Sequence, residues 1–191
     1  GDVYKRQLLI LGDSISAGYG INKKDNWVYL MQQKFDEEGN SIKLINSSVS
    51  GDTTGGGLGR LAKNLKKFDP DFVLIELGGN DALRGYSIKL IKSNLEKMIA
   101  LIKQNKSKVL LMQIRIPPNY GQKYMLAFEK IYKDLALSEE VYLLPFMLEE
   151  IGINSELMQP DGIHPNKKAQ SLIAKDVKKN IDKFLLINQS N

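Results

Sequence analysis

The sequence predicts an α/β fold, a three-layer α/β/α sandwich in which helices cover both faces of a five-stranded parallel sheet. Short runs rich in Val, Ile and Leu alternate along the chain with longer amphipathic segments. A strand that is apolar at every position is typical of a parallel sheet that is buried on both faces. The five predicted strands are LLILG (8–12), IKLINSSV (42–49), FVLIELG (72–78), KVLLMQIRI (108–116) and VYLLPF (141–146).

The segments between and after these runs have the periodicity of helices. In one of them, apolar residues recur at steps of three and four, the period of a helix that buries one face, at Ile88, Ile91, Leu95, Ile99 and Ile102. The five helices are expected near 25–38, 57–67, 87–105, 121–137 and 166–186. Because no internal repeat or linker is visible, residues 1–191 are predicted to form one domain with its core at about 8–186.

The composition fits a globular protein and limits its partners. Of 191 residues, 42% are hydrophobic, and no apolar run reaches the roughly 18 residues that a membrane-spanning helix needs. The formal net charge is +5, but the lysines are spread over the predicted helices, so no nucleic-acid partner is expected. This charge is compatible with a weak, transient attraction to anionic membrane lipid or to acyl-phosphate substrates. The chain has no cysteine, which excludes a thiol nucleophile and a cysteine-ligated zinc site.

Small and polar residues follow every predicted strand. In open α/β sheets, ligands bind outside the carboxyl ends of the strands, so these segments should hold the chemistry. In chain order they are GDS (12–14), SGDTTGGG (50–57), GGND (78–81), RIPPNYG (115–121) and, after an insertion, QPDGIHP (159–165). The candidate site is therefore expected at this edge of the sheet.

His164 is the only histidine, and Asp161 lies three residues before it. A turn of that length lets the carboxylate fold back onto the imidazole, where it would fix the tautomer and stabilise the imidazolium. The alternative is structural, with Asp161 as a turn residue and His164 as the lead-in to the last helix. Since Ser14 also follows a strand, we favour the catalytic interpretation.

Ser14 is the candidate nucleophile. A serine on a sharp turn between a strand and a helix points its Oγ out of the end of the sheet, toward an incoming carbonyl group. Serine also caps helix N-termini routinely, which is the structural alternative. The sequence around Ser14 is G-D-S-I-S, which departs from the G-x-S-x-G motif of α/β-hydrolases at its last position. The sequence therefore predicts a serine hydrolase of a different fold.

An oxyanion needs hydrogen-bond donors that are in place before the charge develops. Gly51 has no side chain to keep its backbone N–H away from a substrate. Asn80 offers a side-chain NH₂ after the third strand, and the N–H of Ser14 is a third candidate donor. The structural alternatives are an ordinary turn at GGND and a loop that starts a helix at SGDTTGGG.

A metal site is the main chemical alternative. Four aspartates follow strands and could together hold Mg²⁺ for phosphoryl chemistry: Asp13, Asp52, Asp81 and Asp161. That interpretation would leave Ser14, Asn80 and His164 without roles, so no metal site is predicted.

These residues form four blocks that resemble the SGNH, or GDSL, hydrolase family, whose sandwich is flavodoxin-like. The blocks are GDSISAGYG with Ser14, SGDTTGGGLGRL with Gly51, LGGND with Asn80 and DGIHP with His164. Further segments resemble the subgroup of multifunctional acyl-CoA thioesterase, arylesterase and lysophospholipase enzymes: GGNDALRG, MQIRIPPNYGQKY and LMQPDGIHPNKKAQ. Ile15 stands where the family signature usually has Leu, which is a minor departure.

The resemblance implies a role for each position. Ser14 would be the nucleophile, His164 the general base and then acid, and Asp161 the orienting carboxylate. Ser14, Gly51 and Asn80 would form the oxyanion hole, and Asp13 would support the turn that holds Ser14. The implied substrate contacts lie in a mobile loop at 82–86 and an acyl-groove wall at 116–120, with the residues Ala82, Leu83, Arg84, Gly85, Ile116, Pro117, Asn119 and Tyr120.

The resemblance also implies partners and location. It predicts a small-molecule acyl ester or thioester as substrate, no metal or organic cofactor, and a monomer. Members of the subgroup are commonly periplasmic or secreted after loss of a signal segment, with the cytoplasm as the alternative. Two other functions stay open: a carbohydrate acetylesterase of the same fold, and a catalytically silent module that binds lipid or glycan.

Overall fold

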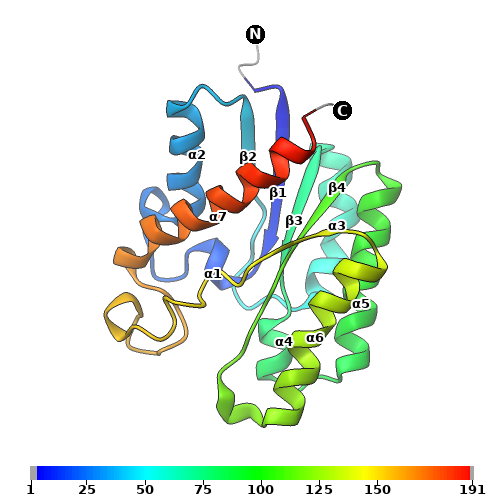
Figure 1. Cartoon of the computed structure of the whole chain (residues 1–191), viewed down its shortest axis with the longest axis vertical. Coiled ribbons are helices and arrows are strands. Elements are labelled where there is room, and N and C mark those ends of the chain that lie inside the picture. Colours follow the sequence, from blue (N-terminus) through cyan, green and yellow to red (C-terminus); the bar gives the residue numbers. More distant parts are fainter. Residues whose placement is uncertain (1–3, 190–191) are drawn as a thin grey trace.

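The computed structural model describes residues 4–189 and confirms the predicted α/β architecture (Figure 1). Its strands form one parallel sheet in the order β2-β1-β3-β4-β5. The apolar positions of the central strands are fully buried, as expected of a sheet that is covered on both faces. The strands are β1 (Arg6–Gly12), β2 (Ile42–Asn46), β3 (Phe72–Glu76), β4 (Lys108–Met112) and β5 (Tyr142–Leu144).

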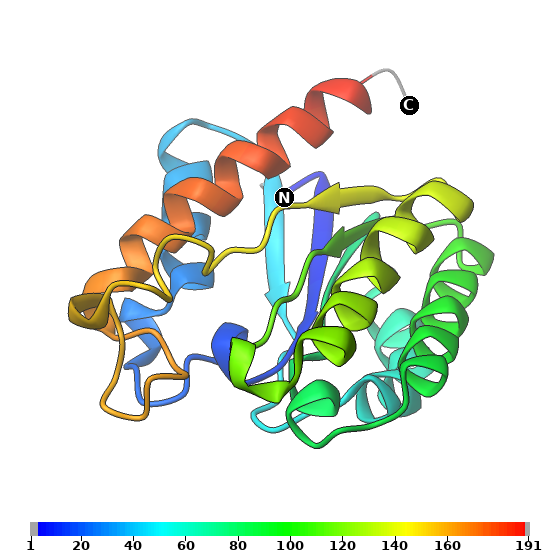
Figure 2. The ribbon, with the colours of Figure 1, turned by 60° about the horizontal axis from the view of Figure 1, so that its bottom comes forward.

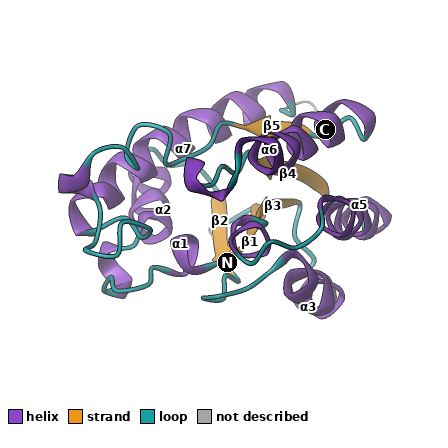
Figure 3. Cartoon of the chain, turned by 90° about the horizontal axis from the view of Figure 1, so that it is seen from below, coloured by secondary structure: helices purple, strands orange, loops and turns teal. Residues whose placement is uncertain are grey.

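Helices cover both faces of this sheet. Helices α2 and α7 pack together on one face, whereas α3, α5 and α6 pack side by side on the other (Figures 2 and 3). None of the helices in residues 4–189 is long and apolar enough to cross a membrane. The α-helices are α1 (Ser14–Ala17), α2 (Trp27–Glu37), α3 (Thr54–Phe68), α4 (Gly79–Leu83), α5 (Ile88–Gln104), α6 (Gln122–Ser138) and α7 (Lys167–Ile187), and short 3₁₀ helices are η1 (Lys23–Asp25), η2 (Pro118–Tyr120) and η3 (Ser155–Leu157).

Four predicted strands extend too far at their carboxyl ends. Strand β4, for example, ends at Met112, whereas the apolar run continues to residue 116. Ile114 and Ile116 are nevertheless buried, at 5% and 7% exposure. The apolar run therefore indicates which residues are buried, and this burial continues beyond the point where β4 stops pairing with its neighbours.

Helix α3 begins three residues earlier than predicted, within a run of glycines. Thr53 caps this helix because its Oγ1 accepts the N–H of Gly56. A Cβ added to Gly57 would lie 2.3 Å from a methyl group of Leu77, so a larger residue would require the buried Leu77 side chain to move. Tertiary packing thus overrides the poor helix propensity of glycine.

The order of the strands determines where a ligand can bind. The chain runs from β1 outward to β2 and then returns to β3 on the other side of β1. Such a reversal opens a crevice outside the carboxyl ends of the two strands at the switch point. Here these strands are β1 and β3, and Ser14 and Asn80 lie two and four residues after their ends. The two short helices that were not predicted, α1 and α4, lie at this edge of the sheet (Figure 1).

Candidate active site

The turn after β1 presents Ser14 as the first residue of the short helix α1. Asp13 is the N-cap of this helix, and its Oδ1 accepts the N–H of Ile15 at 3.1 Å. The interpretation of Ser14 as a helix cap is therefore wrong, because the neighbouring carboxylate takes that position. The hydroxyl of Ser14 is left free to face the carboxyl edge of the sheet.

Ser14, His164 and Asp161 form a continuous chain of hydrogen bonds. The Oγ of Ser14 lies 2.9 Å from Nε2 of His164, although 150 residues separate the two in sequence. The other ring nitrogen, Nδ1, lies 2.6 Å from Oδ2 of Asp161. The second oxygen of Asp161, Oδ1, accepts the backbone N–H groups of Ile163 and His164 at 2.9 and 3.0 Å. The carboxylate is therefore held by its own turn and is aimed at the imidazole.

These hydrogen bonds keep Asp161 ionised. Burial raises the pKa of this carboxyl group, but donation from the amide and ring of His164 and from the amide of Ile163 outweighs it, so the pKa falls to about 2. A carboxylate with this pKa carries its negative charge throughout the neutral range. It is thus available to stabilise a protonated His164.

A second contact fixes the other side of the imidazole. The ring of Tyr19 packs against His164 with a centroid separation of 4.5 Å and an interplanar angle of 38°. The side chain of Gln159 donates to the backbone carbonyl groups of both Tyr19 and Pro165, at 2.8 and 3.0 Å. Sequence reasoning assigned no role to Tyr19 or Gln159, although they lie within the segments GDSISAGYG and QPDGIHP.

The structure brings the expected oxyanion donors to the same edge of the sheet. Gly51 has a φ of +81°, which lies in the left-handed region that favours glycine, and the residue is exposed. Asn80, in α4, donates one hydrogen of Nδ2 to the carbonyl of Asp52 at 2.8 Å. Within residues 4–189, the N–H of Gly51 has no backbone or side-chain acceptor, and the N–H of Ser14 lies in the first turn of α1, where no helical partner exists.

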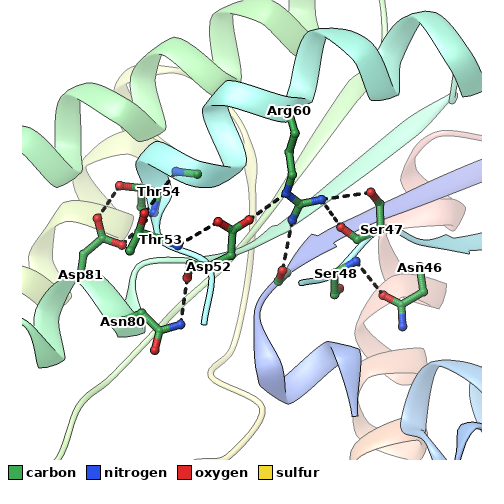
Figure 4. Close-up of polar contacts among 11 residues, drawn as sticks. Asn46, Ser47, Ser48, Asp52, Thr53, Thr54, Arg60, Asn80 and Asp81 are labelled. Atoms are coloured by element: carbon green, nitrogen blue, oxygen red, sulfur yellow. Dashed lines mark hydrogen bonds and ion pairs between the residues drawn. The ribbon is translucent and has the colours of Figure 1, made fainter. Parts of the chain in front are cut away.

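The four aspartates do not form one cluster. Asp13 caps α1, and Asp161 binds His164. Asp52 forms an ion pair with Arg60 at 2.8 Å, while Asp81 accepts both the N–H and the hydroxyl of Thr54 (Figure 4). In the part of the chain that the structure describes, no three His, Asp or Glu side chains are placed to hold a metal ion.

The predicted substrate segments are partly corrected. The segment 82–86 begins as helix α4, not as a loop, because Asp81 anchors this helix to α3 through Thr54. Ala82 is fully buried and so presents no side chain to the surface, whereas Arg84 and Gly85 are exposed. In the other segment Ile116 is buried, and the exposed residues are Pro117, Asn119 and Tyr120. Their contact with substrate stays a prediction, as does that of the half-buried Leu83.

A buried pair of carboxyl groups lies beneath the serine turn. Glu76 ends β3 opposite Gly12 and is 1% exposed, and its Oε1 accepts the hydroxyl of Ser16 at 2.5 Å. Burial, together with the charge of Asp13, raises the pKa of Glu76 well above its usual value. Burial also raises the pKa of Asp13, to about 6. Because burial disfavours the charged form of both groups, the pair retains a proton in the folded protein more readily than in the unfolded chain.

Folding stability should fall as the pH rises through this range. Between pH 3.8, the ordinary pKa of Asp, and about 6, the folded protein holds a proton that the unfolded chain has released. The free energy of unfolding is therefore expected to drop by on the order of 2 kcal/mol between about pH 4 and pH 7. Urea unfolding across this pH range measures the drop.

Asp13→Asn provides the test of its origin. The amide cannot ionise, and its oxygen can still accept the N–H of Ile15 as the cap of α1, so this variant should show a flatter pH profile. Glu149→Gln is the control, because Glu149 forms an exposed ion pair with Arg115 and should leave the profile unchanged. A wild-type profile in Asp13→Asn would contradict the assignment.

With this geometry in place, comparison with known proteins identifies the family. Residues 10–172 match the model of the GDSL-like lipase/acylhydrolase family. The chain belongs to this family. The GDSL resemblance seen in the sequence is thus confirmed, and this GDSL hydrolase is an enzyme that cleaves esters by means of a serine.

Individual relatives of this GDSL hydrolase are similar over most of their length. It is 49% identical to an arylesterase from Vibrio mimicus over 179 residues, which is 94% of this chain and 90% of the relative. It is 46% identical to thioesterase 1/protease 1/lysophospholipase L1 from Escherichia coli strain K12 over 167 residues, which is 87% of this chain and 79% of the relative. The structure of the psychrotrophic esterase EstA from Pseudoalteromonas sp., inhibited by monoethylphosphonate, matches with a TM-score of 0.93 at 42% identity, covering 95% of this chain and 99% of that one.

Proposed function

We propose that Ser14 is the nucleophile of a two-step acyl transfer and that His164 and Asp161 activate it. The observation that carries this proposal is the chain of hydrogen bonds from Ser14 Oγ through both ring nitrogens of His164 to Asp161 Oδ2. This order of groups allows the proton of the serine to pass to Nε2 while the carboxylate balances the charge that develops on the ring.

In the first step, Ser14 Oγ attacks the carbonyl carbon of the ester and His164 Nε2 accepts the hydroxyl proton. The C–O⁻ group of the tetrahedral intermediate is stabilised by the N–H groups of Ser14 and Gly51 and by Asn80. The second hydrogen of Asn80 Nδ2 serves here, since the first is bound to Asp52. The leaving alcohol or thiol takes the proton from His164 as its bond to the acyl carbon breaks.

In the second step, water attacks the acyl group on Ser14. His164 accepts a proton from this water and then returns it to Ser14 as the acid departs. Asp161 keeps its charge throughout, consistent with its pKa of about 2.

Asn80→Ala tests the oxyanion hole. Removal of one oxyanion donor lowers kcat by about 100- to 1,000-fold in enzymes of this kind, because the charge of the intermediate loses a preorganised dipole. We expect a loss of this size for p-nitrophenyl acyl esters, measured as initial rates under saturation.

Asn94→Ala is the matched control for this variant. Asn94 donates to Thr54 Oγ1 at 3.0 Å in the neighbouring polar network and contacts none of the proposed catalytic groups. Its kcat should stay near that of the wild type. Wild-type rates in Asn80→Ala would remove Asn80 from the mechanism.

For the substrate, we propose acyl esters and thioesters with an extended acyl chain, including acyl-CoA and lysophospholipids. Supporting this, exposed apolar side chains occur in and beside the two proposed substrate segments: Tyr86, Tyr120 and Leu126, at 38%, 39% and 54% exposure. The first segment also lies against the start of α6, which follows the second segment, because the hydroxyl of Tyr124 donates to the carbonyl of Tyr86 at 2.5 Å.

A substrate series separates this proposal from its alternatives. Rates of p-nitrophenyl esters from acetyl to dodecanoyl, of acyl-CoA and of lysophospholipids should rise with chain length. A preference for acetylated sugars would favour the carbohydrate acetylesterase instead. Location in the periplasm, a monomeric state and transient contact with membrane lipid stay predictions, which cell fractionation, sedimentation and vesicle binding would test.

A further inference from the structure

Arg60 lies in α3 and binds the end of β1 and two points of the loop between β2 and α3. Its Nε donates to Oδ2 of Asp52 at 2.8 Å, and its Nη2 donates to the carbonyl of Gly12 at 3.3 Å (Figure 4). Its Nη1 donates to the carbonyl of Ser47 and, at 3.1 Å, to the hydroxyl of the same residue. The Arg60 side chain is 23% exposed and that of Asp52 is 12% exposed, so the ion pair is largely withdrawn from water.

Two of the residues that accept from this guanidinium, Gly12 and Asp52, lie close to proposed oxyanion donors in the chain. Gly12 is the last residue of β1 and precedes the turn that carries the N–H of Ser14. Asp52 follows Gly51 directly, and the carbonyl of Asp52 also accepts the side-chain amide of Asn80. The ion pair of Arg60 and Asp52 is therefore linked to all three proposed donors. At most one residue of the chain separates a member or partner of this pair from each donor.

The loop at Gly51 needs such a tether. It lies between β2 and α3, outside any helix or strand, and a Cβ placed on Gly51 would meet no atom within 4 Å. The N–H of Asp52 closes this turn by donating to the carbonyl of Val49 at 3.2 Å, and the N–H of Val49 donates to the carbonyl of Gly12 at 3.0 Å. No backbone bond of this kind holds Gly51 itself within residues 4–189. A donor on so open a loop stabilises an oxyanion well only if its direction is fixed in advance.

The charge of Arg60 has a second effect. The carboxylate of Asp52 lies close enough to Asp13 for its negative charge to be felt there. Without a cation bound to it, the same charge would repel an oxyanion that forms between Ser14 and Gly51. Arg60 thus neutralises the acidic group next to the place where negative charge develops.

We propose that Arg60, paired with Asp52, is a positioning residue that sets the direction of the oxyanion donors in this enzyme. This inference rests on the proposed function of Ser14, Gly51 and Asn80. It adds Arg60, which lies in the block SGDTTGGGLGRL and to which the resemblance assigned no role. Arg60 contacts no substrate in this arrangement, and it acts through Gly12 and Asp52. A lysine cannot replace it, because one ammonium group lacks the planar fork that spans a carboxylate and two carbonyl groups.

The test compares kcat and KM for Arg60→Lys and Arg60→Ala with p-nitrophenyl acyl esters. A donor that is displaced by about 1 Å can cost about 100-fold in rate, so kcat should fall by up to about that factor while KM stays near the wild-type value. Arg60→Lys keeps the charge and should fold even if Arg60→Ala does not, and its kcat should still fall. When either substitution is combined with Asn80→Ala, the fold-decrease in kcat should be smaller than the product of the two single fold-decreases, because both changes disturb the same oxyanion hole.

Lys178→Met is the matched control. Lys178 is a buried cation, 8% exposed, that pairs with Glu38 and Asp182 on the face covered by α2 and α7. The Lys178→Met variant should have a lower melting temperature and an unchanged kcat, the result expected when an ion pair has only a structural role. If Arg60→Lys also kept the wild-type kcat while Asn80→Ala lost its activity, the positioning role would be overturned and the proposed function would stand. Wild-type kcat in both Asn80→Ala and Ser14→Ala would overturn the proposed function itself.

Discussion

Replacement of Ser14 by alanine is expected to lower kcat for p-nitrophenyl acyl esters by about a million-fold. Without the Oγ, no acyl-enzyme can form, and the imidazole of His164 has no hydroxyl to deprotonate at 2.9 Å. The fold should be unaffected, because the cap of α1 is the side chain of Asp13 and not that of Ser14. Initial rates together with a thermal melt measure both expectations.

A fluorophosphonate probe gives an independent readout of the same prediction. The wild-type enzyme should gain the mass of one phosphonyl group, and Ser14→Ala should gain none. Ser16→Ala is the matched control, since Ser16 lies two residues away but is buried and donates to Glu76. This variant should still be labelled. Labelling of Ser14→Ala, or failure to label the wild type, would contradict the role of Ser14 and favour a silent binding module.

Asp161→Asn should lower kcat by about ten-thousand-fold. An amide that presents its NH₂ to Nδ1 of His164 would favour the tautomer with hydrogen on Nε2, which cannot accept the proton of Ser14. It would also lack the charge that stabilises the imidazolium. Because the pKa of Asp161 is about 2, protonation of this carboxylate should not limit the rate between about pH 5 and pH 8. A pH–rate profile checks this expectation.

Asp134→Asn provides the comparison for Asp161→Asn. Asp134 forms an exposed pair with Lys130 on α6, and such surface pairs contribute little. Its kcat should match that of the wild type. A kcat for Asp161→Asn close to that of this control would show that His164 is oriented by other contacts, such as the ring of Tyr19.

The sequence allowed the sheet and the positions of the candidate site to be predicted because both depend on local pattern. Each buried strand is a short apolar run, and parallel strands bring their carboxyl ends to one edge. Ser14, Asn80 and His164 could therefore be placed together before any contact was known. The turn of Asp161 was also predictable, because its contact with His164 spans only three residues.

Other features depend on contacts between distant segments, which no local pattern records. The role proposed for the ion pair of Arg60 and Asp52 depends on the hydrogen bond from Arg60 to Gly12, which lies 48 residues earlier in the chain. Glu76 has the sequence pattern of an ordinary strand end, and only the structure shows it buried against Ser16. Helix α3 starts among glycines because of the close approach of Gly57 to Leu77, which helix propensity alone could not indicate.

The distance in sequence between Ser14 and His164 also has a consequence for the timing of activity during synthesis. The turn that carries His164 is held in place by η3 and α7, and α7 is docked on α2, where Gln170 accepts the N–H of Trp27 at 2.9 Å. Domains begin to fold from the N-terminal side as the ribosome extends the chain. Ser14 therefore emerges early but has no base beside it until the segment around His164 and Gln170 has been made. A growing chain would remain unable to cleave cellular esters until its last helix packs against the rest of the protein.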